Sequence, residues 1–521
     1  MIDVVAIKEK GDKTREMREK RKEKVYSKKT KSLCPVCLSV IDARVFEDDG
    51  KIYIEKSCDE HGDFRDIYWS DAEQFKRFLR YQIPGDPIDN PNTESKDNCP
   101  FDCGLCDKHQ THTMLANIDV TNRCNQRCPI CFANSAVAGY VYEPSFKQIK
   151  EMLVMLRNQK PTPVWVVQFS GGEPTVHPDI LKIIKTAKGL GFSFVMMATN
   201  GVKIAKDLEF TKQLKEAGLN IAYLQFDGMT AEPYIQARGY NALPVKMKAV
   251  ENLKKARIST TLVPTVVKGV NDDQLGDIIE YGFQNLDVIK SVNFQPVSFT
   301  GRIDKKELER RRITVPDIMR LVEKQTEGKI KKEDWLPIPA FAPFEMLIEK
   351  LFKRRVSKSS THMHCGAGMY VFEKDGSYIP LGRFMDLEKA RQIVLKEIES
   401  ERRFVGDIRA KASVVLKLSK TINFSEAPEY FDWKQLLKVA VINRLKNVPE
   451  TLKQKGMFIG CMHFMDPYNF DLERVERCCI HYATPDGRII PFCSYNTIHR
   501  DNIEKKHASY HAVRYQKSLG T

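Results

Sequence analysis

The sequence lacks any long apolar run. Its 521 residues are 42% hydrophobic and 29% charged, and no stretch approaches the ~18 consecutive apolar residues that a membrane-spanning helix requires. Residues 1–24 are rich in Lys, Arg and Glu, and they have neither the apolar segment nor the small-residue cleavage site of a secretory signal peptide. These absences argue against a membrane-spanning or an exported protein, and we expect a cytoplasmic one.

The sequence also lacks an excess of acidic residues. It has 68 Asp and Glu against 83 Lys and Arg, a formal net charge of +15, which favours an anionic partner such as a nucleic acid, an acidic small molecule or an anionic lipid surface. Much of this charge lies in residues 8–31, which have no wide apolar face. Such a composition is more typical of a solvated helix or tail than of a docking arm.

Cysteine, by contrast, is plentiful, with 14 residues. In a large chain of a reducing compartment, this number indicates metal ligation or redox chemistry rather than disulfides. The first group combines Cys34-x2-Cys37 with Cys58-x2-His61, around strand-like alternation and the turn signal Asp48-Asp49-Gly50. This spacing predicts a hairpin module that encloses a single zinc or iron ion.

Residues 114–300 alternate short apolar runs with amphipathic helical segments. The six runs are 114–121, 164–170, 192–199, 221–227, 260–267 and 292–299. In the first gap, Ile149, Met152, Leu153 and Leu156 have the i, i+3, i+4, i+7 spacing of one helix face. The alternation predicts parallel strands joined by right-handed crossovers, in a barrel or an open doubly wound sheet, with the active site at the carboxyl ends of the strands.

Composition divides the rest of the chain, beginning with a Pro- and Asn-rich linker at 83–92. We expect a basic segment and metal module at 1–92, a cysteine segment for an auxiliary cluster at 93–113, the α/β unit at 114–300, a basic helical insertion at 301–360 and a cysteine-rich region at 361–521. Amphipathic stretches at 344–351 and 433–445 fit either core-facing or interfacial helices.

The strongest chemical signal, Cys124-x3-Cys128-x2-Cys131, directly follows the first predicted strand. Three thiolates on one loop suit a [4Fe–4S] cluster and leave one iron open to another ligand, whereas a structural zinc site would need a fourth protein ligand. After the second predicted strand comes Ser170-Gly171-Gly172-Glu173-Pro174. Its glycines let the backbone approach a ligand, and the Glu173 carboxylate can accept hydrogen bonds from an ammonium group.

At these two motifs the sequence resembles the radical S-adenosylmethionine (radical SAM) superfamily, over roughly residues 114–300. The resemblance implies an α/β fold with a partial (β/α)6, TIM-like barrel. It implies that Cys124, Cys128 and Cys131 hold the catalytic cluster, that SAM chelates the open iron, and that Gly171, Gly172 and Glu173 bind the methionyl amine. Thr199, Asn200, Gln225 and Asp227 at later strand ends are further candidates for contact with SAM, although turn chemistry equally explains Asn200-Gly201. One departure is Ile130, where the superfamily usually has an aromatic residue.

This cofactor pair implies the reaction type. One electron from the reduced cluster cleaves SAM to a 5′-deoxyadenosyl radical, which abstracts hydrogen from an unactivated carbon, while the protein positions the reactants and excludes side reactions. We expect no acid–base triad.

The remaining cysteines suggest further metal sites, because 14 − 3 = 11 cysteines plus His61 make three sets of four ligands. Beyond the first module, the set is Cys99, Cys103, Cys106, Cys365, Cys461, Cys478, Cys479 and Cys493, enough for two auxiliary [4Fe–4S] clusters. The first three repeat the spacing of the catalytic loop. The segments after Cys365 and Cys479 resemble the SPASM-type auxiliary-cluster extensions that follow many radical SAM barrels. Some of these residues would otherwise be free core thiols.

Over its full length the cysteine pattern resembles archaeal radical SAM tetraether lipid synthases. That resemblance implies hydrogen abstraction from terminal methyl carbons of isoprenoid chains and an sp3–sp3 carbon–carbon bond, giving tetraether or macrocyclic lipids. The implied partners are a diether phospholipid, a low-potential electron donor and the anionic inner face of the membrane, without nucleic acid. The basic charge agrees with such a lipid surface.

Two alternatives remain open from the sequence. A radical SAM methyltransferase acting on a pterin-like heterocycle would use the same barrel and clusters and would form a methylated product without lipid. From another class, an iron–sulfur electron carrier or a nucleic-acid-binding protein would fit the positive charge, but it would have no need for an open iron. Cleavage of SAM to 5′-deoxyadenosine separates the enzymes from a carrier, and steeply salt-dependent RNA binding would favour the nucleic-acid reading.

Overall fold

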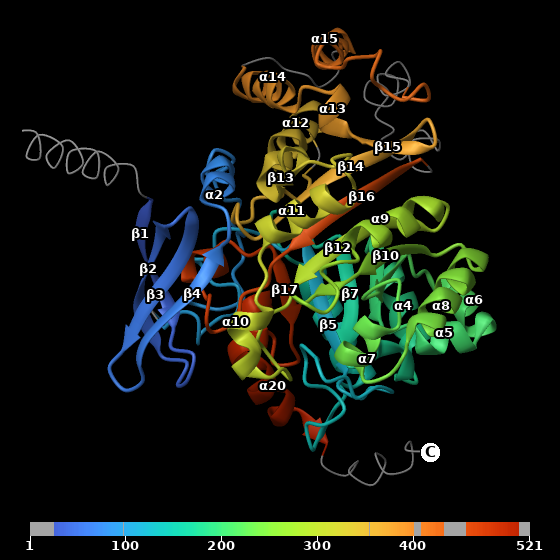
Figure 1. The fold of residues 1–521 in the computed structure, drawn as a ribbon. Coiled ribbons are helices and arrows are strands. Elements are labelled where there is room, and N and C mark those ends of the chain that lie inside the picture. Colours follow the sequence, from blue (N-terminus) through green and yellow to red (C-terminus); the bar gives the residue numbers. More distant parts are fainter. Residues whose placement is uncertain (1–25, 97, 354, 401–407, 432–454, 510–521) are drawn as a thin grey trace, which may run out of the picture.

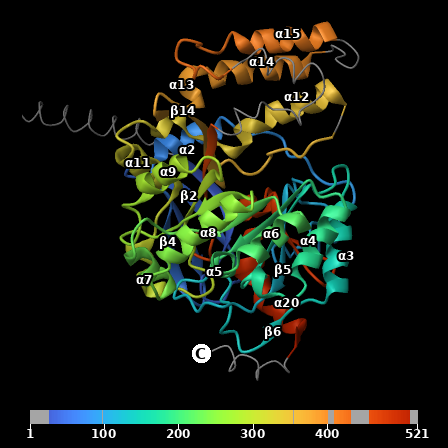
Figure 2. The ribbon, with the colours of Figure 1, turned by 90° about the vertical axis from the view of Figure 1, so that its right-hand side faces the viewer.

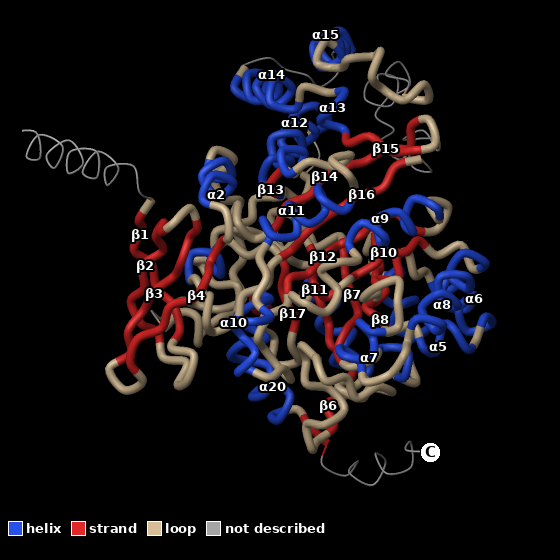
Figure 3. Tube along the Cα trace, viewed as in Figure 1, coloured by secondary structure: helices blue, strands red, loops and turns tan. Residues whose placement is uncertain are grey.

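The computed structural model describes residues 26–96, 98–353, 355–400, 408–431 and 455–509. Two sheets organise it (Figures 1 and 3): a four-stranded antiparallel sheet near the N-terminus and a 13-stranded sheet with a parallel core. Functional groups are positioned mainly by the second sheet, and the first contributes a metal-binding module at its side.

The N-terminal module is an antiparallel meander. Its elements are β1 (Ser27–Leu33), β2 (Val40–Asp48), β3 (Lys51–Cys58), β4 (Gly62–Trp69) and the following helix α2 (Ala72–Leu79). Asp49 and Gly50 both have positive φ, 46° and 70°, as a two-residue type I′ hairpin requires. The predicted hairpin is confirmed.

The expected solvated helix or tail at 8–31 is wrong for its last part, because residues 27–31 belong to β1. Backbone pairing with β2, from Ser27 opposite Phe46 to Leu33 opposite Val40, outweighs the polar composition. Residues 8–25 lie outside the described residues.

All six predicted apolar runs form strands. They are β5 (Leu115–Thr121), β7 (Val166–Gly171), β8 (Phe194–Thr199), β9 (Ile221–Gln225), β10 (Ser259–Val263) and β12 (Ile289–Pro296), which lie side by side and parallel in the order β5-β7-β8-β9-β10-β12. The predicted α/β fold, a partial (β/α)6 barrel, is confirmed.

Helices cover the outer face of these strands (Figure 2). They are α3 (Phe146–Arg157), α4 (Ile180–Gly189), α5 (Val202–Lys206), α6 (Leu208–Ala217), α7 (Glu232–Arg238), α8 (Leu243–Lys255) and α9 (Leu275–Gln284). α3 shows why they form where they do: Ser145 and Gln148 make a reciprocal capping box, and the predicted stripe from Ile149 to Leu156 is buried. The short helices α5 and α7 were not predicted, because too few turns are present for a clear periodicity.

The C-terminal region is joined to both edges of the parallel sheet. β16 (Gly456–Met462) pairs in parallel with β12, and β17 (Ile480–Ala483) pairs in parallel with β5. The intervening residues 463–479 therefore run from the β12 edge of the parallel sheet to its β5 edge. They cover the open side that a six-stranded partial barrel leaves.

The remaining elements form the flanks. Beside β16 lie β13 (Leu336–Pro337), β14 (Gly366–Lys374) and β15 (Ser377–Pro380); β18 (Ile489–Pro491) pairs with β17, β11 (Thr265–Val266) pairs with β12, and β6 (Val141–Tyr142) pairs with β19 (Ala508–Ser509). The helices are α10 (Leu308–Arg311), α11 (Val315–Gln325), α12 (Ala342–Phe352), α13 (Leu381–Phe384), α14 (Leu387–Glu399), α15 (Ile408–Ser419), α18 (Leu472–Glu476), α19 (Phe492–Ser494) and α20 (Arg500–Lys506).

The first amphipathic stretch, 344–351, lies in α12 and packs with α14 and α15 in a small apolar cluster. The second, 433–445, lies outside the described residues. Among the helices that the structure describes, none combines the length and the apolar character needed to cross a bilayer.

Candidate active site and metal centres

A cavity of about 390 Å³ opens at the carboxyl ends of the barrel strands. Its wall combines the three cysteines of the loop after β5, the Gly171-Gly172 turn after β7 and the strand ends at Thr199, Asn200 and Gln225. Across from them it is lined by C-terminal residues that include Phe464, Ile480, Tyr482 and Phe492. The cavity is the place where the structure brings the predicted site residues together.

The loop that carries Cys124, Cys128 and Cys131 is held from two sides. Arg302 Nε donates to the Cys128 carbonyl at 2.7 Å, and the backbones of Cys131 and Arg302 exchange two hydrogen bonds of 2.9 Å. On the other side, Arg238 Nη1 donates to the Ile130 carbonyl at 2.9 Å. The sequence analysis did not predict a role for either arginine, because neither lies in a recognisable motif.

The chemistry of the loop fits an iron–sulfur cluster. Burial raises the pKa of the Cys124 thiol to about 12, with a smaller contribution from Glu173, and burial also raises the pKa of Cys128. Buried thiols of this kind give up their protons to a cationic metal, so metal binding and thiolate formation are coupled. Three soft ligands on one cavity wall leave space beside them for a further ligand of iron.

The glycine pair packs directly against the cysteine loop. A Cβ on Gly171, whose φ is +123°, would lie 2.1 Å from the Thr121 carbonyl oxygen, and one on Gly172 would lie 2.2 Å from the Arg123 carbonyl oxygen. The Gly172 N–H donates to Thr121 at 2.7 Å. Only glycine fits both positions, and the resulting bare backbone on the cavity wall is the cradle that a polar ligand such as the methionyl amine requires.

Glu173 lies behind this wall and is fully buried. Its Oε1 accepts hydrogen bonds from the Thr175 and Thr199 hydroxyls at 2.7 and 2.8 Å, and its Oε2 accepts the Asn200 N–H at 2.7 Å. Glu173 thus joins the ends of β7 and β8. A carboxylate oxygen accepts more than one hydrogen bond, so Oε2 retains acceptor capacity, and direct binding of the methionyl amine by Glu173 stays a prediction.

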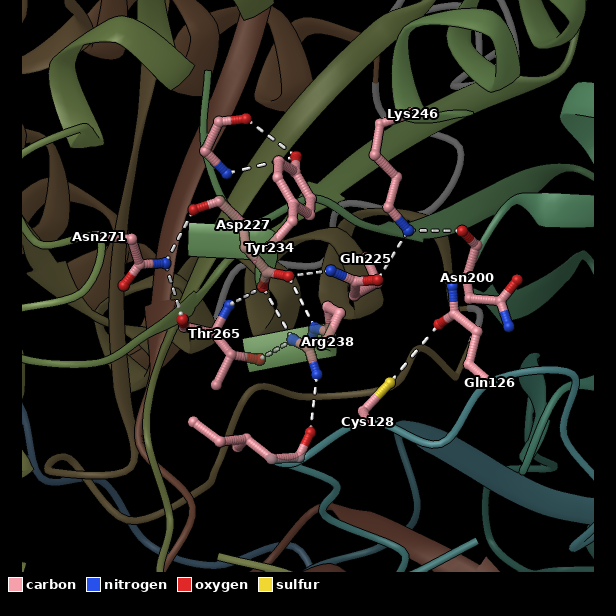
Figure 4. A network of polar contacts seen from close by, with 12 residues as sticks. Gln126, Cys128, Asn200, Gln225, Asp227, Tyr234, Arg238, Lys246, Thr265 and Asn271 are labelled. Atoms are coloured by element: carbon pink, nitrogen blue, oxygen red, sulfur yellow. Dashed lines mark hydrogen bonds and ion pairs between the residues drawn. The ribbon is translucent and has the colours of Figure 1, made fainter. Parts of the chain in front are cut away.

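Asp227 is also fully buried, and it forms a bidentate pair with Arg238 (Figure 4). The two guanidinium contacts measure 2.7 and 2.8 Å, and the neighbouring carboxylate holds the pKa of Arg238 above its usual value. Since Arg238 also holds Ile130, the pair connects the end of β9 to the cysteine loop. The structure therefore places Asp227 behind the cavity wall, while Gln225 faces the cavity.

The four ligands predicted in the N-terminal module lie together: the ligand atoms of Cys34, Cys37, Cys58 and His61 are all within 4.8 Å of one another. Three of the separations are 4.0 Å for Cys37 to Cys58, 3.8 Å for Cys34 to His61 and 3.5 Å for Cys58 to His61. Tetrahedral zinc with Zn–S of about 2.3 Å needs ligand separations of about 3.8 Å. The geometry fits a single metal ion with four protein ligands.

We expect a Cys58→Ser variant to lose this ion and to loosen the module, because metal binding contributes directly to the folding free energy of small metal domains. Metal analysis should show about one ion fewer per chain, and hydrogen exchange should accelerate in β2 and β3. The visible iron–sulfur absorbance should be retained. Unchanged metal content would contradict the ligand assignment.

Seven of the other eight cysteines fall into two groups, which are linked by contacts of neighbouring residues. Cys99 lies next to Cys103, which raises the Cys99 pKa, and Ser494 beside Cys493 contacts the Cys103 sulfur at 3.4 Å. The segment that follows Cys106 is bound to the Cys478 carbonyl by Thr111 at 2.6 Å. Cys365, Cys478, Cys479 and Cys493 are close enough for their charges to interact.

Cys461 is placed differently. It lies on β16, pairs with Phe294 of β12 and is buried in the main apolar core. Burial raises its pKa well above the usual value. Its surroundings are those of a core thiol.

The chain is similar in sequence to known protein families. The radical SAM superfamily profile matches residues 118–282, and the profile of the HMPTM N-terminal zinc ribbon domain matches residues 26–70. The 7,8-dihydro-6-hydroxymethylpterin dimethyltransferase of Methanocaldococcus jannaschii is 51% identical over 485 residues, which cover 92% of this chain and 95% of the relative. The GTP 3′,8-cyclase of Clostridium acetobutylicum is 26% identical over 39% of this chain and 65% of its own. The crystal structure of SuiB from Streptococcus suis matches 42% of this chain and 46% of its own, with 16% identity and a TM-score of 0.34.

The chain is therefore a radical SAM enzyme, with SAM and a [4Fe–4S] cluster as cofactors and a mononuclear metal site at its N-terminal end. More narrowly, it belongs to the family of the 7,8-dihydro-6-hydroxymethylpterin dimethyltransferase. Because the chain belongs to an enzyme superfamily, the alternative that it is only an iron–sulfur electron carrier is excluded.

The same relative corrects the expected substrate. The relative is named for dimethylation of a pterin, and it is 51% identical to this chain over nearly the full length. This finding contradicts the predicted tetraether lipid synthase, with its carbon–carbon coupling of isoprenoid chains and its diether phospholipid partner. The pterin methyltransferase alternative is the one that this finding supports.

Proposed function

We propose that this chain is a radical SAM methyltransferase whose substrate is a reduced pterin such as 7,8-dihydro-6-hydroxymethylpterin. The observation that carries the proposal is the 51% identity to the dimethyltransferase over nearly the whole of both chains. Identity at this level extends beyond the shared barrel to the metal module and the C-terminal region, where a relative with the barrel alone would not match.

A set of polar side chains within the otherwise largely apolar cavity wall supports a heterocyclic substrate. Asn117, Gln168, Tyr223, Asn293 and Gln295 project from β5, β7, β9 and β12 into it. Gln168 donates to Asn117 at 2.9 Å, but its own buried Oε1 has no partner among the described residues. The Tyr223 hydroxyl accepts from Asn293 and Gln295 at 2.5 and 2.8 Å, which leaves its proton free to be donated.

A pterin ring carries alternating donors and acceptors along its edge, and these could satisfy the amide and phenol groups. An aliphatic chain would leave the Gln168 Oε1 and the Tyr223 proton desolvated and unpaired, at a cost of about 1–3 kcal/mol for each group. These polar groups would disfavour a saturated hydrocarbon in the same way that enzyme pockets with hydrogen-bonding groups reject analogues that lack the matching group.

The roles of the site residues follow from their positions. Cys124, Cys128 and Cys131 would hold the cluster, the Gly171-Gly172 backbone would receive the methionyl group, and Thr199, Asn200 and Gln225 would contact the rest of SAM along the cavity wall. Glu173 and Asp227 would act behind the wall by fixing these strand ends. When bound, the cluster and SAM supply reductive radical chemistry, and the surrounding protein orients the substrate carbon and excludes water.

Mass spectrometry after anaerobic incubation tests the proposal directly. The cluster-loaded protein, SAM, a low-potential reductant and 7,8-dihydro-6-hydroxymethylpterin should give a pterin heavier by one CH2 for each methyl group transferred, together with 5′-deoxyadenosine. SAM with a deuterated methyl group identifies the methyl donor. Formation of 5′-deoxyadenosine over an unchanged pterin would overturn the substrate assignment.

We also propose two auxiliary [4Fe–4S] clusters in the group of seven cysteines, one begun by Cys99, Cys103 and Cys106 and the other by Cys365, Cys478, Cys479 and Cys493. Their supports are the proximity of these thiols and the buried Arg474, which interacts with Cys365 and lies at the side of Cys493. A buried guanidinium is suited to balance the negative charge of a thiolate-ligated cluster.

A Cys478→Ala variant should accordingly contain about four iron atoms fewer per chain than the unaltered protein. The matched control is Cys461→Ala, which removes a buried thiol from the apolar core and should keep its full iron content. Iron and sulfide analysis provides the measurement. Equal iron losses in the two variants would contradict the assignment of Cys478 to a cluster and of Cys461 to the apolar core.

A further inference from the structure

Lys246 occupies a buried position at which packing alone would favour an apolar residue. It lies on α8, whose other buried positions include Ala249, Val250 and Leu253, and its side chain is fully buried. Burial lowers its pKa to about 8. A buried ammonium is costly unless it is fully hydrogen-bonded, so a specific set of partners must compensate for it.

Those partners are the ends of two neighbouring strands (Figure 4). The ammonium donates to the Asn200 carbonyl, just beyond β8, at 2.5 Å and to Gln225 Oε1, the last residue of β9, at 2.7 Å. Lys246 therefore sets the separation of Asn200 and Gln225 from behind. Both of these residues line the cavity.

On the β8 side, the link continues to the cluster loop. The Asn200 N–H donates to Glu173 at 2.7 Å, and the Asn200 side chain donates to Asn125 Oδ1 at 2.7 Å and lies 3.8 Å from the Cys124 sulfur. A shift of the Asn200 backbone would consequently move a neighbour of the first cluster ligand.

On the β9 side, the link continues to the buried ion pair. Gln225 donates its amide N–H to Asp227, which is paired with Arg238. The amide of Gln225 is thereby oriented at both ends, with its oxygen toward Lys246 and its nitrogen toward Asp227. Rotation of this amide would break both contacts.

We propose that Lys246 is a positioning residue for SAM, which fixes the two strand ends between which the methionyl and ribose parts of the cofactor would lie. The inference rests on the cofactor contacts proposed above and not on the identity of the substrate. Lys246, a helix residue outside the sequence motifs described above, would thereby control the affinity and orientation of SAM.

The test uses Lys246→Met, which keeps an unbranched chain of similar length and removes the charge and the donors. SAM affinity of the cluster-loaded protein, measured by equilibrium dialysis, should fall about 10- to 100-fold, as expected for loss of charged hydrogen bonds. The electron paramagnetic resonance spectrum of the reduced cluster should also change less on addition of SAM. A merely structural substitution would not alter this spectral response.

Lys56→Met is the matched control. Lys56 is a second buried lysine whose pKa burial lowers to about 8, and it donates to Ser32 Oγ at 2.9 Å and to the Pro467 carbonyl at 2.6 Å, at the N-terminal module. This variant should lose thermal stability while SAM affinity changes less than about twofold.

Equal SAM affinity and an unchanged spectral response in Lys246→Met would overturn the proposal. If Lys246→Met fails to retain its cluster, Lys246→Gln provides the same measurement, because its amide keeps neutral N–H donors without the charge and should show an intermediate loss. Wild-type affinity in a cluster-loaded Lys246→Gln would equally overturn it. Neither readout involves the pterin, so failure here is distinguishable from failure of the proposed substrate.

Discussion

A Cys128→Ala variant should form 5′-deoxyadenosine from SAM at least about a thousandfold more slowly than the unaltered enzyme. Cys128 supplies one of three thiolates on the catalytic loop, and two remaining ligands cannot hold a cluster with a single open iron. The effect should be local, because Arg302 holds this residue through its backbone carbonyl, which alanine keeps. Chromatographic quantification of 5′-deoxyadenosine under reducing anaerobic conditions provides the measurement.

Cys461→Ala serves as the control, since it also removes a buried thiol but lies in the apolar core. It should retain SAM cleavage. Appreciable cleavage by Cys128→Ala, with iron content unchanged, would show that the loop is not the catalytic cluster site.

The second large effect is expected at Arg238. Replacement by methionine leaves the fully buried Asp227 carboxylate without its cationic partner, which should lower the free energy of unfolding by about 3–5 kcal/mol. The cysteine loop would also lose its contact at the Ile130 carbonyl, so cluster occupancy should fall at the same time. Thermal unfolding and iron analysis measure the two effects.

An exposed ion pair provides the matched control. Arg310 pairs with Glu307 with 67% and 34% of the side chains exposed, and Arg310→Met should cost less than about 1 kcal/mol. The double variant Asp227→Asn, Arg238→Met should be more stable than Arg238→Met alone, because it removes the uncompensated charge. Equal losses for Arg238→Met and Arg310→Met would contradict the role given to the buried pair.

The sequence was sufficient to predict the barrel strands because each is a continuous apolar run with a helix between it and the next. It was also sufficient for the two metal-binding loops, since their ligands are adjacent in sequence and their spacing carries the chemistry. Arg238, Arg302 and Lys246 could not be found in this way. Their partners lie on other elements, and a single charged residue has no periodicity to mark it.

The C-terminal strands show the same limit at a larger scale. Nothing in the local pattern of residues 456–462 or 480–483 reveals that one pairs with β12 and the other with β5. The substrate was mispredicted for a related reason: cysteine spacing indicates which clusters a chain can hold, but it carries no information about the cavity residues on which substrate choice depends.

The pairing of β16 and β17 with the two edges of the barrel has a consequence for biosynthesis. A ribosome releases β5 to β12 well before these strands, so the nascent barrel has two unpaired edges, at β5 and β12, for the time needed to translate the intervening residues. Exposed edges of this kind invite pairing with other chains. The pairing of Leu115 with Ile480 also joins residues that are far apart in sequence, which slows folding. Insertion of iron should therefore follow completion of the polypeptide, and cells that make this enzyme need to protect the unfinished chain from aggregation before its metal centres can be loaded.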